Sequence, residues 1–516
     1  MNKILDCVAA MLSNYKIDNH EIRFSHIFIP VVVGIACGMA ILYFLGLEAK
    51  WVTICLAGMA VPFLSLLDPN PRRFILLLLV FVIPMNAAIT FFRYPLLVSG
   101  PQGIVISLSD VALFTLLFLW ILDISRNKTK IAFHPELSLP YLGFICMCLL
   151  SMFSSANIQL SLFEIFSMIK LFLLYLYIVN NIHTKEELRA IVIFLLLGLF
   201  LESIIGIIQY FRGSPIGLYV FGEYDELMEF SLDDRMTYRI GGTMGHTNCY
   251  AKYLGLLLPL CLSVFIAVSK FKYKLIGGVI FILGTVVLIF TLARAAWVGL
   301  IASIMVTLFL LYRNEKSRQK VIRNTIVFGC IFIVVIFIQS GSIISRITSD
   351  DHGSGLARIQ LAQIAFNMIR THPFFGVGIN NFTVVMRQYD DTIAQISAYF
   401  PHPVHNVYLC YASEIGIPGL LFFLWFFIRA YWDGYQNAKS KDILLASIHI
   451  GFIAGIVSVA IQGLTGYGFK HGYDLMAIVW LQIGCMNAFR KMQDTLPNKK
   501  PNEPTAVALI KKTYEE

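Results

Sequence analysis

Three arginines and one histidine from distant parts of the chain offer most of the chemistry in this sequence. Arg239 opens RIGGTMGHTN, Arg294 lies in TLARAAWVGL, Arg358 lies in SGLARIQLAQIAFNMIRTHP, and His405 lies in FPHPVHNVYL. A guanidinium keeps its proton and matches the geometry of phosphate oxygens. A neutral imidazole, with an ordinary pKa of about 6.5, can accept a proton from a hydroxyl group. These residues therefore predict anion binding next to general-base catalysis.

Each of these residues also has a plainer interpretation. Arg294 could reach from a helix end to lipid headgroups, but the small neighbours in ARAAW favour a guanidinium held inside the protein. Arg239 could be a simple loop anchor. For Arg358, a solvated helix residue is an equally open alternative, and His405 could order the start of the following helix together with Asn406.

Further substrate contacts are expected from residues close to these four. His246 and Asn248 follow Arg239 near a helix start, and Asn406 follows His405. Tyr219 and Tyr224 could stack on sugar rings, although packing at a membrane interface explains them as well. The acidic pairs of the chain are adjacent on loops and do not indicate a converging ligand set, so we expect no metal and no cofactor.

The composition indicates the kind of structure that must position these residues. The 516-residue chain is 58% hydrophobic and 14% charged, with a mean hydropathy of +0.74. These values are typical of an all-α integral membrane protein, because a spanning helix needs about 20 apolar residues. We predict one polytopic domain, residues 1–516, with about 14 spans (12–14), which start near residues 26, 51, 74, 109, 139, 160, 187, 247, 275, 296, 324, 416, 443 and 472.

The distribution of lysine and arginine predicts the orientation. Most of these residues fall in alternate connections, which places both termini, including the tail 490–516, in the cytoplasm. The net charge of +9 then reflects topology and contact with anionic membrane lipids, and no nucleic-acid partner is expected. Ionisable residues inside spans should face protein or water rather than lipid; they are Glu164, Lys170, Glu202, Lys252, Glu414 and Arg429.

Two long outer connections break the pattern of short loops, at 211–243 and 341–403. The second should carry amphipathic helices. SGLARIQLAQIAFNMIRTHP has Ser354 as a candidate N-cap, apolar residues at helical spacing and Pro373 as a stop. NFTVVMRQYDD is expected to begin another short helix. These helices would lie across the outer end of the bundle, where the four candidate residues are also expected.

The chain resembles the O-antigen ligase and polymerase family of bacterial polytopic membrane glycosyltransferases. The resemblance covers roughly residues 239–430 and rests on RIGGTMGHTNCYAKYLGLLLPL, TLARAAWVGL, RIQLAQIAFNMIRTHPFFGVGINNF and HPVHNVYLCYASEIGIPGLLFF. It implies a GT-C-like enzyme of the bacterial inner membrane, with its active site facing the periplasm. Arg239 and Arg294 would bind the pyrophosphate of an undecaprenyl-pyrophosphate-linked glycan donor, Arg358 would help hold it, and His405 would assist the hydroxyl of a lipid-linked glycan acceptor.

The resemblance leaves the acceptor open. A polymerase of surface polysaccharide is favoured by the number of predicted spans and the long second outer loop, and chain-length regulator or flippase proteins would be its partners. A ligase that transfers the glycan to lipid A-core, or to a protein, is the alternative. A polysaccharide flippase or transporter is a further alternative, although it should carry ionisable residues along a midplane path.

Overall fold

The computed structural model describes most of residues 49–313 and 354–495. The gaps inside these ranges are 66–69, 95–99, 129–130, 225–229, 233–234, 238, 268–270, 467–469 and 471–472, and elsewhere only positions 34, 38, 318–319, 322–323 and 329 are described. Most of the spans predicted near residues 26 and 324, the part of the second long loop at 341–353, and the tail from 496 onward lie outside the described residues.

The described chain is a bundle of apolar helices, as predicted. Nine of its helices are long and apolar enough to cross a membrane: α5 (Leu108–Asn127), α6 (Pro135–Ser151), α7 (Ile158–Asn181), α8 (Lys185–Arg212), α9 (Thr247–Ala267), α10 (Phe271–Phe290), α11 (Arg294–Arg313), α17 (Val407–Asn437) and α18 (Ile443–Gln462). Shorter apolar segments occupy three more predicted positions: α3 (Ala49–Ser65), α4 (Pro71–Val82) and part of α19 (Tyr473–Thr495). The count of fourteen spans is not confirmed.

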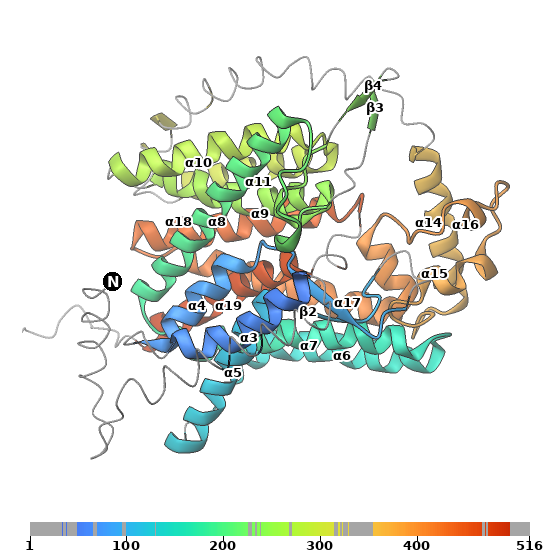
Figure 1. Ribbon diagram of the computed structural model, residues 1–516, viewed down its shortest axis with the longest axis horizontal. Helices are drawn as coiled ribbons and strands as arrows, with labels where there is room; N and C mark the ends of the chain where they lie inside the picture. Colours follow the sequence, from blue (N-terminus) through green and yellow to red (C-terminus); the bar gives the residue numbers. More distant parts are fainter. Residues whose placement is uncertain are drawn as a thin grey trace, which may run out of the picture.

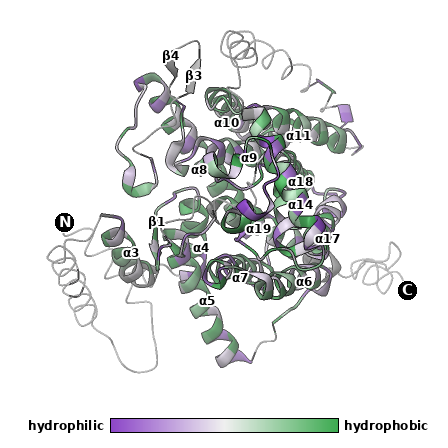
Figure 2. Cartoon of the chain, turned by 90° about the vertical axis from the view of Figure 1, so that its right-hand side faces the viewer, coloured by the Kyte–Doolittle hydropathy of each residue, from purple (hydrophilic) through white to green (hydrophobic). Residues whose placement is uncertain are grey.

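Most helices of the bundle run roughly parallel to one another, and Figure 2 shows them coloured largely as hydrophobic (Figures 1 and 2). Helix α9 is the most enclosed candidate span, because 89% of its apolar window is buried. It packs against α18, α10 and α11. Since α9 starts directly after the segment that contains Arg239, the best-anchored helix of the bundle lies beside one of the candidate residues.

Local sequence signals explain where several helices begin. Ser107 and Asp110 form a capping box at the start of α5, and Thr184 and Glu187 form one at the start of α8. Helix α8 ends at Gly213, which has a φ of 64°, a left-handed conformation that glycine adopts without steric cost. These local contacts determine where α5 and α8 begin and where α8 ends.

Two short antiparallel hairpins depart from the all-helical prediction. Strand β1 (Ala88–Phe91) pairs with β2 (Ile104–Ser107), with Ala88 opposite Ser107. Strand β3 (Phe230–Leu232) pairs with β4 (Arg235–Thr237) inside the first long loop, which also contains the 3-10 turn η2 (Tyr219–Phe221). Strands of three or four residues give too little alternation to be recognised in so apolar a sequence.

The second long loop forms a small helical layer at one end of the bundle (Figure 1). Helix α14 (Ser354–Thr371) ends before Pro373, as predicted, and α15 (Phe382–Val385), the 3-10 turn η4 (Met386–Tyr389) and α16 (Ile396–Tyr399) follow. Apolar side chains of this layer form a separate core, which includes Leu361, Ile364, Met368 and Phe382. Helices are therefore present where the sequence predicted them, and they lie at one end of the bundle.

Helix α17 contains a break that joins it to this layer. Gly416 has a φ of 76°, and the break exposes backbone groups of α17 to the segment that follows α14. Val377 and Gly378 donate backbone hydrogen bonds to the carbonyls of Ser413 and Glu414, both at 2.9 Å. A Cβ on Gly416 would lie 2.2 Å from the carbonyl oxygen of Phe374. The close approach of the two backbones thus requires glycine.

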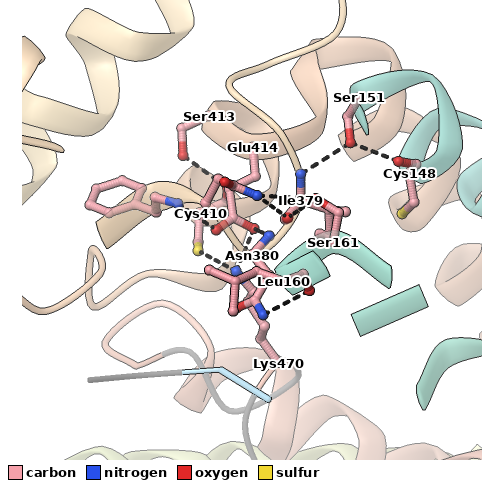
Figure 3. Close-up of polar contacts among 12 residues, drawn as sticks. Cys148, Ser151, Leu160, Ser161, Ile379, Asn380, Cys410, Ser413, Glu414 and Lys470 are labelled. Atoms are coloured by element: carbon pink, nitrogen blue, oxygen red, sulfur yellow. Dashed lines mark hydrogen bonds and ion pairs between the residues drawn. The ribbon is translucent and has the colours of Figure 1, made fainter. Parts of the chain in front are cut away.

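A buried carboxylate reinforces this junction (Figure 3). Glu414 accepts hydrogen bonds from the backbone N–H groups of Asn380 (3.0 Å) and Phe382 (3.2 Å), and it forms an ion pair with Lys470 from the segment before α19. Asn380 in turn donates to the carbonyl of Leu160 in α7, at 3.1 Å. One side chain therefore ties together α17, the turn after α14 and the segment before α19.

The other ionisable residues of the spans lie against protein groups or a cavity. Lys170 pairs with Asp110 at 2.6 Å, with both side chains almost fully buried. Arg429 pairs with Glu136 and Asp433. Glu202 accepts hydrogen bonds from Thr243, and Glu164 and Lys252 line an internal cavity.

Candidate functional site

The candidate residues meet around one cavity of about 1100 Å³. Arg239, Arg294, Arg358 and His405 all line it, although they come from four separate parts of the chain. The predicted convergence of these residues is found in the structure, whereas their chemical roles stay predictions. The cavity is large compared with typical ligand sites of about 300–1,000 Å³, so it can hold more than one small group.

The segment before α9 holds Arg239 in a fixed position. It forms a 3-10 turn, η3 (Gly242–Met244), which lies against α8. The Gln209 side chain accepts a hydrogen bond from Gly242 N at 2.9 Å, and Glu202 accepts one from Thr243 N at 3.1 Å. A Cβ on Gly242, whose φ is 57°, would lie 2.5 Å from the Glu202 carboxylate. The glycines of the motif therefore allow the turn to approach α8 closely.

Arg239 is buried, with 8% of its surface exposed, and is fixed by contacts to a second element. Its Nε donates to the carbonyl oxygen of Thr291 at 3.0 Å, and its Nη2 donates to Asn248 Oδ1 at 3.4 Å. Thr291 lies in the turn between α10 and α11 that leads directly into Arg294. The two arginines that were predicted to act together are thus connected through one hydrogen-bonded turn.

The turn that leads into Arg294 is short and is held by hydrogen bonds to the end of α10. Thr291 donates its side-chain hydroxyl to the carbonyl of Leu288 at 2.6 Å, and Leu292 has a φ of 55°, which is uncommon for a residue other than glycine. Trp297 Nε1 donates to the same carbonyl of Leu288 at 3.3 Å. Arg294 is then the first residue of α11. Helix ends and side-chain bonds, rather than a long loop, determine its location.

His405 lies in an ordered junction that is attached to the end of α18. Asn406 is the N-cap of α17: its side-chain oxygen accepts hydrogen bonds from the N–H groups of Tyr408 and Leu409, both at 3.0 Å. Its side-chain amide donates to the carbonyl of Leu464 at 3.2 Å, and Val407 N donates to the carbonyl of Gly463 at 2.9 Å. The Asn406 side chain, which was predicted to contact substrate, is therefore engaged in capping α17, and Asn406 is not among the residues that line the cavity.

The surroundings of His405 favour the neutral imidazole. Burial lowers the pKa of His405 to about 4, and the positive charges of Arg358, His402 and Lys252 contribute in the same direction. Burial, with Lys252 and Arg239, lowers the pKa of His246 to about 4 as well. At neutral pH both rings are uncharged, so each has one acceptor nitrogen. In His246 this is Nδ1, which already accepts the backbone N–H of Asn248 at 3.1 Å.

The remaining predicted contacts divide into two groups. His246, Asn248 and Tyr224 line the cavity, as does the exposed Arg358 from the first turns of α14. Tyr219, in η2, is 41% exposed and is not among the residues that line the cavity. A position in the same loop was therefore not sufficient to place a tyrosine in the site.

The structure places further charged residues in the cavity wall that were not assigned to the site from the sequence, and two of them lie within apolar helices. Lys252, at 9% exposure, and Glu164, at 4%, line the cavity from α9 and α7. Both were recognised only as charges that should avoid lipid. The signal was present, because an ionisable residue within a span is by default a candidate functional residue. Within the described residues, no group of three or more His, Cys, Asp or Glu side chains is arranged to hold a metal ion.

Comparison with known families finds a match to part of the chain. Residues 279–424 match the family model described as O-antigen ligase. This confirms the resemblance found in the sequence, and the matched range includes Arg294, Arg358 and His405. No curated protein matches the chain significantly.

Proposed function

Starting from the match of residues 279–424 to the O-antigen ligase family, we propose that the protein is a membrane glycosyltransferase of surface polysaccharide biosynthesis. It transfers a glycan from undecaprenyl pyrophosphate to a sugar hydroxyl of a lipid-linked acceptor. The observation that carries the proposal is the single cavity lined by Arg239, Arg294 and His405. The protein would act in the bacterial inner membrane, with the cavity open to the periplasm.

The arginines would bind the leaving group. As the bond between the anomeric carbon and the pyrophosphate oxygen breaks, its electron pair stays on the pyrophosphate, and negative charge develops there. Arg239 is buried and hydrogen-bonded, so its guanidinium does not have to reorganise during the reaction. Arg358 and Lys252, which also line the cavity, add further basic groups. The donor brings the energy of its own phosphate bond, so no nucleotide is required.

His405 would act as the general base. The acceptor hydroxyl gives its proton to the imidazole, and its oxygen forms the new bond to the anomeric carbon while the pyrophosphate departs. A base with a pKa of about 4 is weak, but the pKa of His405 should rise once the anionic donor occupies the cavity. The protonated ring can then pass its proton to the released pyrophosphate or to water.

Two acceptors are compatible with this chemistry. We favour a polymerase, because the long second loop, which includes α14–α16, suits an enzyme that handles two lipid-linked glycans. A ligase that transfers the glycan to lipid A-core, or to a protein, is the second candidate, and the description of the matching family favours it. Both use the same donor and release the same pyrophosphate.

The test is reconstitution of the purified protein in liposomes with an undecaprenyl-pyrophosphate-linked glycan. A ladder of glycan lengths on the polyprenyl lipid, with release of undecaprenyl pyrophosphate, is the expected result. Transfer only when lipid A-core is added would identify a ligase. Movement of intact donor across the bilayer without bond cleavage would overturn the proposal in favour of a transporter.

A further inference from the structure

Three lysines are buried within the part of the chain that the structure describes, and two of them have a carboxylate partner. Lys170 pairs with Asp110, and Lys470 pairs with Glu414 (Figure 3). Lys252, in α9, is as buried as Lys470, with 9% of its surface exposed, but it makes no hydrogen bond or ion pair with any described residue. Buried charges are normally paired, so Lys252 requires a separate explanation.

The ammonium of Lys252 lies at the cavity wall, beside the junction that holds His405. Its Nζ is 3.6 Å from the position that a Cβ on Gly466 would take, and both residues line the cavity. Gly466 follows two residues after Leu464, whose carbonyl accepts a hydrogen bond from the Asn406 side chain. The positive charge of Lys252 is also one of those that lower the pKa of His405. The ammonium therefore lies within electrostatic reach of the proposed base.

Lys252 lies on the same side of α9 as a residue that contacts Arg239. Arg239 Nη2 donates to Asn248 Oδ1, and Asn248 and Lys252, four residues apart, lie on one face of the helix. Both line the cavity, and the charges of Lys252 and Arg239 together lower the pKa of His246. The lysine thus continues the basic wall of the cavity from the turn before α9 into α9 itself.

The cavity wall offers Lys252 no counter-charge. Glu164 is the one carboxylate among the described residues that line the cavity, and it forms no ion pair with Lys252. The arginines of the wall add charge of the same sign. A buried cation without a partner lowers the stability of the protein, and an anion that binds beside it recovers this loss. The free protein therefore carries a charge that a ligand has to match.

We infer that Lys252 is the counter-charge of a bound phosphate group, which takes the place that a carboxylate takes at Lys170 and Lys470. The ammonium donates to a phosphate oxygen, and such charge-assisted hydrogen bonds are strong. Lysine acts on phosphate as a compact point charge, so it complements the planar forks of the arginines. A sugar hydroxyl or a polyprenyl chain would leave the charge of Lys252 unmatched. The inference rests on the proposed function for the identity of the ligand, which is the pyrophosphate of a polyprenyl-linked donor.

The first test compares two lysines that are equally buried in the wall of the same cavity. It uses the full-length protein in phosphate-free buffer, after bound lipid has been exchanged for detergent. Lys252→Met should raise the melting temperature, because it removes an isolated charge. Lys470→Met should lower it, because it leaves Glu414 without its cation. Lys272→Met, at an exposed position in the first turn of α10, is the control and should leave it unchanged.

The second test measures binding independently of turnover. The probe is farnesyl pyrophosphate, and its affinity is obtained from the rise of the melting temperature with its concentration. Lys252→Met should weaken binding by about tenfold or more, because a hydrogen bond between charged groups is lost. Lys252→Arg keeps a cation and should recover most of the affinity. Farnesol, which lacks the pyrophosphate, should not distinguish Lys252→Met from the native protein. If Lys252→Met fails to fold, Lys252→Gln provides a second neutral variant.

Three results would overturn the role of Lys252. A lower melting temperature of Lys252→Met without ligand would show that the lysine supports the fold. Equal affinities of the native protein and Lys252→Met for farnesyl pyrophosphate would show that no phosphate contacts it. A Lys252-dependent shift as large with phosphatidylglycerol would assign the lysine to membrane lipid.

These outcomes are distinguishable from failure of the proposed function. Lys252-dependent binding of farnesyl pyrophosphate without transfer to any acceptor would remove only the transferase. Transfer by the native protein, together with unchanged probe binding in Lys252→Met, would remove only the phosphate contact of Lys252.

Discussion

Arg239 Nε donates a hydrogen bond to the carbonyl oxygen of Thr291, at 3.0 Å, across 52 residues of sequence. Because Thr291 lies three residues before Arg294, this bond connects the two guanidinium groups that were proposed to bind one pyrophosphate. A change at either arginine should therefore affect the position of the other, and their effects on transfer should not be additive.

Arg239→Lys should lower kcat by about 10²-fold or more, because lysine keeps the charge but loses the planar fork and the Nε–H that contacts Thr291. The measurement is release of undecaprenyl pyrophosphate in detergent. Arg212→Lys, at the exposed last turn of α8, is the matched control and should retain full activity. Full activity of Arg239→Lys would show that charge alone is sufficient at this position.

The pH dependence of transfer should report the environment of His405. A general base works when it is neutral, so the rate falls as the pH drops through its pKa. Burial and the neighbouring positive charges lower the pKa of His405 to about 4 in the free protein, so kcat/KM should stay constant from pH 8 to about pH 5. The acid limb of the pH profile of kcat should lie at higher pH than that of kcat/KM. The bound anionic donor favours the imidazolium and so raises the pKa of His405. An acid limb of kcat/KM near pH 6.5, which is about the ordinary pKa of histidine, would show that the pKa of His405 is not lowered.

Arg358→Gln should move the acid limb of kcat/KM upward. It removes a positive charge that helps to lower the pKa of His405, so the ring should take up a proton at higher pH. Arg370→Gln provides the control, because Arg370 is an exposed arginine at the other end of the same helix and does not line the cavity. If both variants have the same pH profile as the native protein, Arg358 does not act on His405.

The ion pair between Glu414 and Lys470 should dominate the stability of the junction around α17. Lys470→Met leaves a buried carboxylate without its cation, and we expect the free energy of unfolding to fall by about 3–5 kcal/mol. Unfolding in mixtures of detergent and SDS gives this quantity. The double variant with Glu414→Gln should be more stable than Lys470→Met alone, because it leaves no isolated buried charge and its amide oxygen still accepts one of the two N–H groups, of Asn380 and Phe382, that the carboxylate accepted. Simple addition of the two single losses would argue against a coupled pair.

Gly416→Ala should destabilise the protein strongly. The new Cβ would lie 2.2 Å from the carbonyl oxygen of Phe374, and the φ of 76° disfavours alanine as well. Gly58→Ala is the matched control, because a Cβ at Gly58 in α3 meets nothing within 4 Å. The apparent melting temperature should fall for Gly416→Ala and should be unchanged or slightly higher for Gly58→Ala. Equal melting temperatures would show that the break in α17 can relax.

The sequence was a good guide wherever a local signal was strong. Apolar length predicted the helices of the bundle, and Ser354 and Pro373 bracketed α14 correctly. Motifs with glycine, arginine and histidine located the walls of the cavity. The hairpins β1–β2 and β3–β4 were missed because short strands in an apolar chain carry little periodicity.

Long-range pairing could not be read from the sequence in the same way. Glu164 and Lys252 were recognised as ionisable residues that cost free energy in lipid. That both line the same cavity depends on how α7 and α9 pack. The capping role of Asn406 and its contact with Leu464 likewise require the end of α18 to lie beside the start of α17. Local patterns determine which residues are unusual, and packing determines which of them meet.

The attachment of His405 to the end of α18 has a consequence for biosynthesis. The carbonyls of Gly463 and Leu464 that anchor this junction are translated almost sixty residues after the imidazole itself. A nascent chain that is still short of residue 464 has its arginine turn in place but cannot yet orient the histidine. If the proposed function holds, activity should therefore appear only late in translation, after the ribosome has delivered α18 and the residues directly after it to the membrane.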